Sequence, residues 1–428
     1  MTRLLSQTAL TIALLACLSA RSVDAAEQTH PFTVEAGDHD RSNTPVTVLL
    51  PAAKNGGSVT LTDAAGNRIP AQLTAPGLLN EHHDDLCELH FILPSLKKGQ
   101  SMKFSAVVSD AAPGDGFAWK DTPGKYRELS YDEKPVLRYM YEALDESRRE
   151  ETYKVFHHLY NPAGTRFATK GHGGQFTHHR GIFFGFNRVS YEGGKADTWH
   201  CSGDAHLSHE GFLAAEAGPV LGRHQVAVDW HGSPKRVFAK ERRELTVYHM
   251  PGGHLVEFAS RLATAGGKVK LDGDPQHAGF QFRAAQEVAA GDQKSTYYLR
   301  TDGKGAPGET RNWSKGNDQC ADLPFNAMSF VIDGNRYTAV YLDSPSNPKE
   351  ARYSERSYGR FGSYFEYELD EDKDLVINYR IWLQDGEMTI EQVAALSADF
   401  VEPPTWTRQS LFAPRKDVPK KYSSSDPL

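Results

Sequence analysis

Histidine is concentrated in one stretch of this sequence. Ten of the 18 histidines fall within residues 157–231, and the densest run is GHGGQFTHHRG at residues 171–181. Imidazole titrates near neutral pH and is the side chain most often used for acid–base catalysis and metal binding. The neighbouring glycines let a ligand approach the backbone closely. The run therefore predicts a functional site.

Each polar side chain of this run suits a role. His179 is expected to act as the catalytic base with His178 beside it, and His172 and Gln175 are expected to bind substrate. Arg180 could neutralise an anionic group, because a guanidinium pairs bidentately with carboxylates and phosphates. If the two adjacent histidines lie on a strand, their side chains point to opposite faces and at most one reaches the site. For each histidine, a buried and hydrogen-bonded structural role is the alternative.

A second group of candidates follows downstream. Trp199 offers a flat apolar face on which a sugar ring can stack, and His277 is a further candidate for substrate binding. None of the spacings matches a compact metal motif such as H-E-x-x-H. The cofactor therefore stays open. A divalent metal, if one takes part, would be held by His172, His179, His200 and Asp197, brought together in three dimensions.

The run YSERSYGRFG at residues 353–362 also combines reactive side chains, and its glycines favour a shaped loop. Its candidates are Tyr353, Glu355, Arg356, Tyr358 and Arg360. Either tyrosine could serve as the catalytic acid, and the glutamate as the carboxylate of a glycosidase mechanism. The arginines could bind substrate, and the first of them, like Arg180, could neutralise developing negative charge. A solvated loop without function is the alternative.

Several other functional classes find no support. The sequence contains no G-x-S-x-G nucleophile motif, no G-x-x-x-x-G-K phosphate-binding loop and no dinucleotide-binding fingerprint. The formal net charge is −7 and no basic block occurs. Nucleic acid is therefore not an expected partner.

The first residues are typical of an export signal. Arg3 supplies a positive charge, residues 8–20 are apolar but too short to span a bilayer, and Val23 and Ala25 occupy the −3 and −1 positions of a small-residue cleavage site. Residues 1–25 therefore predict a periplasmic, secreted or outer-surface protein. A lipid anchor at Cys17 is the alternative. No later segment is apolar enough for a transmembrane helix.

Alternating apolar and polar residues predict strands along most of the chain. The expected fold is all-β, and its segments are a small β-sandwich (27–110), a linker (111–125), a large antiparallel β-sandwich carrying the histidine-rich site (126–402) and a loose tail (403–428). Thr389 and Gln392 form a capping box, which predicts one C-terminal helix.

Three cysteines follow the signal: Cys87, Cys201 and Cys320. They are too few for a disulfide framework. One bridge and one buried thiol are expected.

The run THHRGIFFGFN at residues 177–187 resembles a family of secreted bacterial proteins called the PmoA family or methane oxygenase PmoA, a domain of unknown function. The resemblance spans roughly residues 130–400, and its supporting pieces are YNP at 160–162, GHGG at 171–174, DTW at 197–199 and QHAGFQFR at 276–283. It implies a β-sandwich like that of the galactose-mutarotase superfamily and a role in carbohydrate chemistry. It carries over no catalytic residues. Methane oxidation is not expected, because that enzyme's subunit is embedded in the membrane.

Three functions remain in order of preference. The first is an exported carbohydrate lyase or glycoside hydrolase acting on an oligosaccharide or polysaccharide with His, Tyr and Arg chemistry. The second is a non-catalytic glycan-binding protein of the cell surface, in which Trp199 and tyrosines stack on sugar rings. The third is a metal-dependent oxygenase.

Overall fold

The computed structural model describes residues 28–51, 57–83, 85–109, 112 and 114–408. The expected signal at 1–25, including Cys17, lies outside the described residues, as does most of the expected tail. None of the helices in the described part of the chain is long and apolar enough to cross a membrane.

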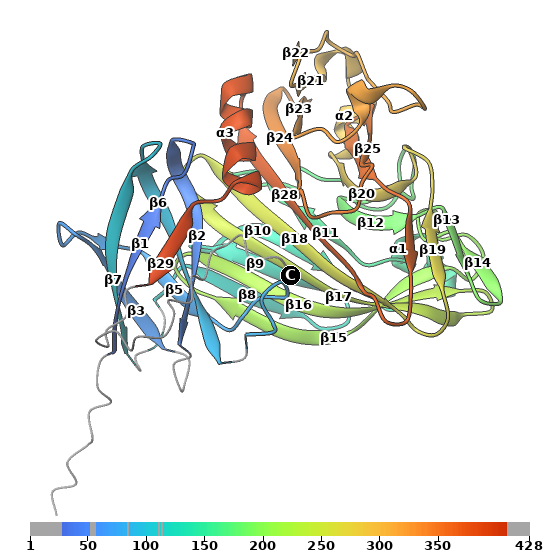
Figure 1. The fold of residues 1–428 in the computed structure, drawn as a ribbon. Helices are drawn as coiled ribbons and strands as arrows, with labels where there is room; N and C mark the ends of the chain where they lie inside the picture. The colour runs from blue at the N-terminus through green and yellow to red at the C-terminus, as the bar shows by residue number, and fades with distance from the viewer. Residues whose placement is uncertain (1–27, 52–56, 84, 110–111, 113, 409–428) are drawn as a thin grey trace, which may run out of the picture.

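The N-terminal segment forms a small β-sandwich of two antiparallel sheets (Figure 1). One sheet contains, in order, β29 (Thr405–Arg408), β1 (Gln28–Glu35), β7 (Ser101–Ser109), β3 (Ser58–Asp63) and β4 (Arg68–Ile69). The other contains β2 (Arg41–Pro51), β6 (Leu86–Leu96) and β5 (Ala71–Thr74). Alternate residues of β2 are buried, as the period of two in its sequence predicts.

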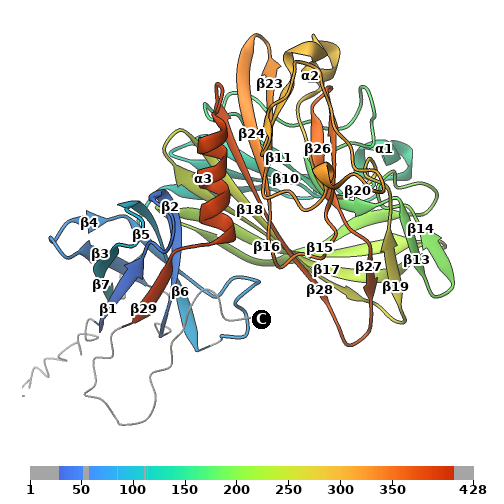
Figure 2. The same ribbon diagram turned by 45° about the horizontal axis from the view of Figure 1, so that its top comes forward.

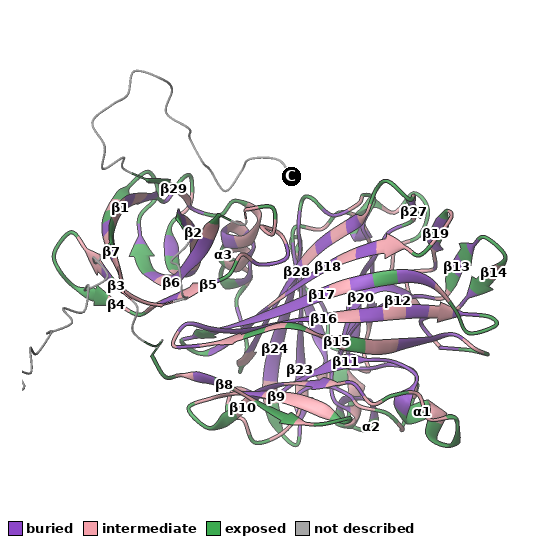
Figure 3. Cartoon of the chain, turned by 90° about the horizontal axis from the view of Figure 1, so that it is seen from below, coloured by how far each residue is buried: buried purple, intermediate pink, exposed green. Residues whose placement is uncertain are grey.

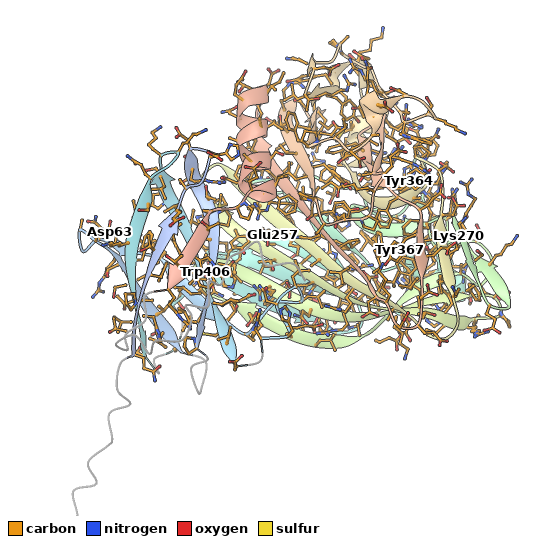
Figure 4. All side chains as sticks on the ribbon, in the orientation of Figure 1. Asp63, Glu257, Lys270, Tyr364, Tyr367 and Trp406 are labelled. Atoms are coloured by element: carbon orange, nitrogen blue, oxygen red, sulfur yellow. The ribbon has the colours of Figure 1, made fainter. Side chains whose placement is uncertain are left out.

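The C-terminal end of the described chain completes this small sandwich. The expected loose tail began at residue 403, but β29 pairs with β1, and Trp406 is buried among the apolar side chains of the small core. Figure 4 shows this tryptophan inside the small sandwich. The indole supplies the apolar contact that orders the segment, so this part of the prediction was wrong.

The large β-sandwich consists of two broad antiparallel sheets. The eight-stranded sheet contains, in order, β25 (Arg352–Arg356), β26 (Arg360–Tyr364), β20 (Ala278–Arg283), β12 (Ile182–Phe186), β11 (Phe156–Leu159), β10 (Lys134–Met140), β9 (Tyr126–Tyr131) and β8 (Phe117–Thr122). The nine-stranded sheet contains β15 (His206–Ala217), β16 (Leu221–Gly232), β17 (Arg236–Met250), β18 (Gly253–Thr264), β28 (Leu375–Asp385), β24 (Asn335–Asp343), β23 (Asn326–Ile332), β21 (Tyr297–Arg300) and β22 (Gly303–Lys304). The two sheets bury one continuous core between them.

Smaller elements decorate the large sandwich. A four-stranded sheet contains β14 (Gly194–Ala196), β13 (Arg188–Tyr191), β19 (Val269–Asp272) and β27 (Tyr367–Leu369). The helices are α1 (Arg149–Thr152), α2 (Gln286–Ala290) and α3 (Ile390–Val401). The capping box of Thr389 and Gln392 is present at the start of α3, which confirms that prediction. The expected linker at 111–125 is partly strand, because Phe117 in β8 is buried in the core.

Helix α3 lies between the two sandwiches and contacts both (Figures 1 and 2). Its Asp399 accepts hydrogen bonds of 2.9 Å from Arg41 and from Thr44 of β2. On the other side, Ser397 donates to the carbonyl of Pro324. The helix therefore fastens the small sandwich to the large one.

A buried polar network holds the same interface. Arg223 of β16 donates to Glu88 of β6 over 2.8 Å, and both side chains are buried. Gln72 of β5 accepts from the backbone of Val220 and Leu221. Burial opposes ionisation of Glu88, but Arg223 and His90 hold the pKa of Glu88 well below its usual range. Figure 3 shows exposed residues mainly at the loops and edges of the two sandwiches.

We predict that Arg223→Ala lowers the free energy of unfolding by about 3–5 kcal/mol, because it leaves the buried Glu88 carboxylate without its partner. Arg242→Ala is the matched control: Arg242 also crosses the interface, to Glu81, but its side chain is 42% exposed, so its loss costs at most about 1 kcal/mol. Urea unfolding measures both variants. Equal losses of unfolding free energy in the two variants would contradict a stabilising role for the buried Arg223–Glu88 pair.

We also predict that the free energy of unfolding decreases as the pH falls below about 6.5. Burial lowers the pKa of His158 and His224 to about 3 and that of His254 to about 4, against about 6.5 in the unfolded chain. The unfolded chain therefore binds more protons below pH 6.5, and stability is lost as pH falls toward these folded-state values. Each histidine contributes a slope of roughly 1.4 kcal/mol per pH unit.

Urea unfolding between pH 7.5 and 4.5 tests this expectation. His254→Gln should reduce the dependence of the free energy of unfolding on pH by roughly 1.4 kcal/mol per pH unit, the contribution of one proton. His82→Gln, at an exposed position, should leave this dependence unchanged. A free energy of unfolding that stays constant over this range would refute the account.

Candidate functional site

Three loops meet beside β12 and β20, at the end of the large sandwich away from the small one (Figures 1 and 2). Each contributes one histidine: His178, His200 and His277. One ligand-capable atom from each ring lies within 4.8 Å of those of the other two. We call these three residues the histidine cluster. Their side chains are half-buried, so the cluster is open to solvent.

Two members of the cluster, His200 and His277, each end a four-residue turn of the same pattern, D-x-x-H. Asp197 accepts from the Nδ1 of His200 over 2.7 Å and from the backbone amide of the same histidine. Asp274 accepts from the Nδ1 of His277 over 2.9 Å and from the amide of Gln276. In each D-x-x-H turn the carboxylate orients the ring and leaves Nε2 available. Burial opposes ionisation of Asp274, but the hydrogen bonds from His277 and from the Gln276 backbone lower the pKa of Asp274 well below its usual range.

The end of β12 holds both turns. The amide of Phe186 donates to Thr198, whose own amide donates back to the Phe186 carbonyl. Next in sequence, the Asn187 amide donates to the His277 carbonyl over 3.0 Å, and its side chain donates to Asp274 over 2.8 Å. Since β12 is wholly buried, the two turns share one rigid support.

Buried cations hold the loop that carries His178. The Lys154 ammonium donates to the carbonyl oxygens of His178 and Trp199 and thereby joins two of the three loops. Burial lowers the pKa of Lys154 to about 8. Arg180 donates to the carbonyls of Thr177, His179 and Glu150. This arginine positions the backbone, and its expected role in neutralising substrate charge is not supported.

The adjacent histidines do not lie on a strand. Residues 171–180 form turns with left-handed backbone at Gly173, Gly174 and Phe176. The rings of His178 and His179 consequently meet edge to face with centroids 4.4 Å apart. The expectation that they point to opposite faces was therefore wrong. Burial and the His200 ring lower the pKa of His178 to about 3.

His179 belongs to a trio of rings beside the cluster. Its ring is near-parallel to that of Tyr358, with ring centroids 6.0 Å apart. The ring centroid of Phe176 lies 5.4 Å from that of His179 and 4.9 Å from that of Tyr358. Neither ring nitrogen of His179 has a hydrogen-bond partner among the described residues. Burial and the charges of Arg360 and Arg283 lower its pKa. Phe176 is 41% exposed and forms the outer face of the trio.

Sequence reasoning placed several other residues in the site wrongly. The run 353–362 is the hairpin β25–β26 inside the eight-stranded sheet, and burial in that sheet accounts for the difference. Tyr353 is buried and donates to the Leu323 carbonyl. Glu355 is buried in a salt bridge with Arg300. Trp199 is 1% exposed and cannot stack on a ligand.

The remaining candidates divide by exposure. His172 and Gln175 are exposed on the loop, where they can reach a ligand. Arg356 is half-buried and donates to Asn312 and to the Glu355 carbonyl. Arg360 is buried and donates from two of its nitrogens to Gln281 and Ser354.

The expected metal set is not the one that converges. Among the described residues, His200 groups with His178 and His277, not with His172 and His179. Asp197 lies behind His200 and orients its ring. The repeated D-x-x-H pattern at 197–200 and 274–277 was the sequence signal that could have identified this arrangement. The expected disulfide is also absent, because Cys201 and Cys320 are both free, buried thiols.

A polar hollow borders the turn that begins at Asp197. It has a volume of about 370 Å³, and its lining includes Asn187, Asp197, Ser202, Asp204 and Ser233. Asn187 and Asp197 also support the D-x-x-H turns, but no histidine of the cluster lines the hollow.

Comparison with solved structures finds distant likenesses. An α-mannosidase from Enterococcus faecalis has 10% identity and a TM-score of 0.41; the match covers 89% of this chain but 46% of that one, so the chain spans about half its length. A GH36 α-galactosidase from Geobacillus stearothermophilus has 9% identity, a TM-score of 0.32 and coverages of 64% and 41%. A galactose mutarotase related enzyme from Lactobacillus acidophilus has 8% identity, a TM-score of 0.29 and coverages of 64% and 98%.

No curated protein matches the sequence. One family model matches residues 127–398 and is described as a family of unknown function, DUF6807. This span agrees with the expected resemblance over residues 130–400, while the PmoA name stays a prediction. Since the match covers more than half of the sequence, the chain belongs to the DUF6807 family.

Proposed function

We propose that this chain is an exported carbohydrate-active enzyme whose acid–base chemistry takes place at His179 and Tyr358. The observation that carries the proposal is the ring trio: an imidazole that is only 3% exposed, with both nitrogens unpartnered among the described residues, lies beside a half-buried phenol and an exposed phenylalanine. A sugar ring stacked on Phe176 would cover the trio, and the Phe176 ring has to move aside for the sugar to reach the buried nitrogens of His179. The expected export signal is part of the proposal.

Lyase chemistry suits these side chains better than hydrolysis. A glycoside hydrolase commonly uses two carboxyl groups that flank the scissile bond, but Glu355 is committed to Arg300, and Asp197 and Asp274 to histidines. Arg283 and Arg360, in contrast, are buried near His179 and keep N–H groups without a partner among the described residues. Their positive charge would stabilise the anion that forms when a base removes a proton next to a carbonyl group.

The proposed reaction is a β-elimination. The neutral ring of His179 takes the proton from the carbon next to a carboxylate or ketone, a carbon–carbon double bond forms and the carbon–oxygen bond to the leaving sugar breaks. Tyr358 donates a proton to the leaving oxygen. Proton exchange with water then restores both residues, so atoms and charge balance.

A non-catalytic glycan-binding protein is the second candidate. The exposed ring of Phe176 and, separately, the polar hollow of about 370 Å³ beside Asp197 favour it, because sugars are held by stacking on aromatic rings together with hydrogen bonds to their hydroxyls.

The activity prediction is that the purified protein releases an unsaturated, ultraviolet-absorbing product from some member of a panel of plant and algal polysaccharides and 3-keto-glycosides. His179→Ala and Tyr358→Phe should each lower kcat by about 10²–10⁴-fold while circular dichroism shows an intact fold. His82→Ala, at an exposed position in the small sandwich, is the control. Reducing ends without ultraviolet absorbance would indicate hydrolysis, and glycan retention without either product would indicate binding. Full activity of His179→Ala would refute the site.

Phe176 and Trp199 provide a second test. Phe176→Ala should weaken glycan binding about tenfold or more and change the free energy of unfolding by no more than about 0.5 kcal/mol, because the ring is exposed. Trp199→Ala should instead destabilise the protein by about 3–5 kcal/mol, because it empties a buried site. Glycan affinity electrophoresis and urea unfolding measure the two effects. If Phe176→Ala binds glycan as tightly as the original protein, Phe176 is not the stacking surface.

A further inference from the structure

The histidine cluster has no part in the reaction proposed above, yet its construction is specific. The two D-x-x-H turns each fix an imidazole by a hydrogen bond from Nδ1 to a carboxylate, at 2.7 Å and 2.9 Å. Both rings therefore keep the lone pair of Nε2 free and directed away from the carboxylate. A metal-binding histidine in proteins almost always has such a partner behind it, which fixes the tautomer and raises the basicity of the ligating nitrogen.

The third ring completes the set. His178 keeps its Nε2 buried and without a hydrogen-bond partner among the described residues, although buried ring nitrogens normally find one. Its centroid lies 4.4 Å from that of His200 and 6.3 Å from that of His277. A cation that accepts the free nitrogen lone pairs would satisfy this ring together with the other two.

We propose that His178, His200 and His277 bind one divalent transition-metal ion. Imidazole ligands suit zinc, copper, iron and nickel, and three histidines with a fourth position open are the protein ligands of a catalytic zinc site. The candidate ligand atoms lie within 4.8 Å of one another, and side-chain rotation alone has to bring them to the roughly 3.4 Å that a tetrahedral ion with 2.1 Å bonds requires.

The charges around the cluster fit a dication. Three neutral imidazoles bring no charge, and the carboxylates of Asp197 and Asp274 behind two of them supply two negative charges. The ammonium of Lys154 is close to His178 and opposes the ion, but the carbonyl oxygens of His178 and Trp199 accept its hydrogen bonds. The bound ion would supply a Lewis acid at the solvent-facing side of the site.

A second group is less suited to an ion. The candidate ligand atoms of Glu210, Asp229 and His231 also lie within 4.8 Å of one another. His231, however, already uses Nε2 in a hydrogen bond of 2.8 Å with Ser208. This group therefore serves as a matched comparison in the test.

The test uses the full chain without a polyhistidine tag, stripped with a chelator and titrated with Zn²⁺ by calorimetry. Elemental analysis gives the stoichiometry, and Co²⁺ substitution shows by visible absorbance whether the geometry is tetrahedral. We expect one ion per chain and a higher Tm with Zn²⁺. His277→Ala should weaken Zn²⁺ binding at least a hundredfold and abolish the rise in Tm, whereas His231→Ala should bind as the original protein does.

Asp274→Asn is the variant that keeps the shape of the turn, and it should weaken Zn²⁺ binding about 10–100-fold. If His277→Ala does not fold, this variant decides the question. Less than one ion per chain, unchanged affinity in Asp274→Asn, or loss of binding in His231→Ala would each overturn the proposal. The result is independent of the proposed carbohydrate chemistry, because a protein that binds zinc and leaves every glycan untouched would retain the metal site and refute only the lyase.

Discussion

The backbone at the end of β12 is the constraint on which the whole site depends. Phe186 exchanges hydrogen bonds with Thr198, and Asn187 bonds both the backbone of His277 and the side chain of Asp274. Because β12 is paired with β20 in a fixed register and buried on both faces, neither turn can shift without breaking sheet hydrogen bonds. The spacing of the His200 and His277 imidazoles is consequently set by the end of this strand, whereas Lys154 and Arg180 hold the loop of His178.

Charge is distributed unequally around this support. Arg283 and Arg360 lie on the side of His179 and Tyr358, whereas Asp197 and Asp274 stand behind the histidine cluster. Both arginines keep N–H groups without a hydrogen-bond partner among the described residues. The site thus has one side that favours developing anions and one that favours a cation.

The small sandwich stabilises the molecule without contributing to the site. It is fastened to the large sandwich through Arg223, Glu88 and helix α3, and the pairing of β29 with β1 brings the two ends of the described chain together. The site strands β12 and β20 lie at the opposite end of the large sandwich (Figures 1 and 2). Polar groups at the interface are satisfied by one another, so the two domains are joined as one unit.

The sequence by itself determined the all-β class, the large antiparallel sandwich, the capped C-terminal helix and the loop where histidines gather, because these features follow from patterns over a few neighbouring residues. Only the tertiary structure decided which side chains meet. It buried Trp199, Tyr353 and Glu355 and joined His277 to His178 and His200 from distant parts of the chain. The reason is physical: local alternation reports which residues face the core of a strand, whereas convergence depends on which distant strands and loops come together, and the pattern within one segment does not specify its partners.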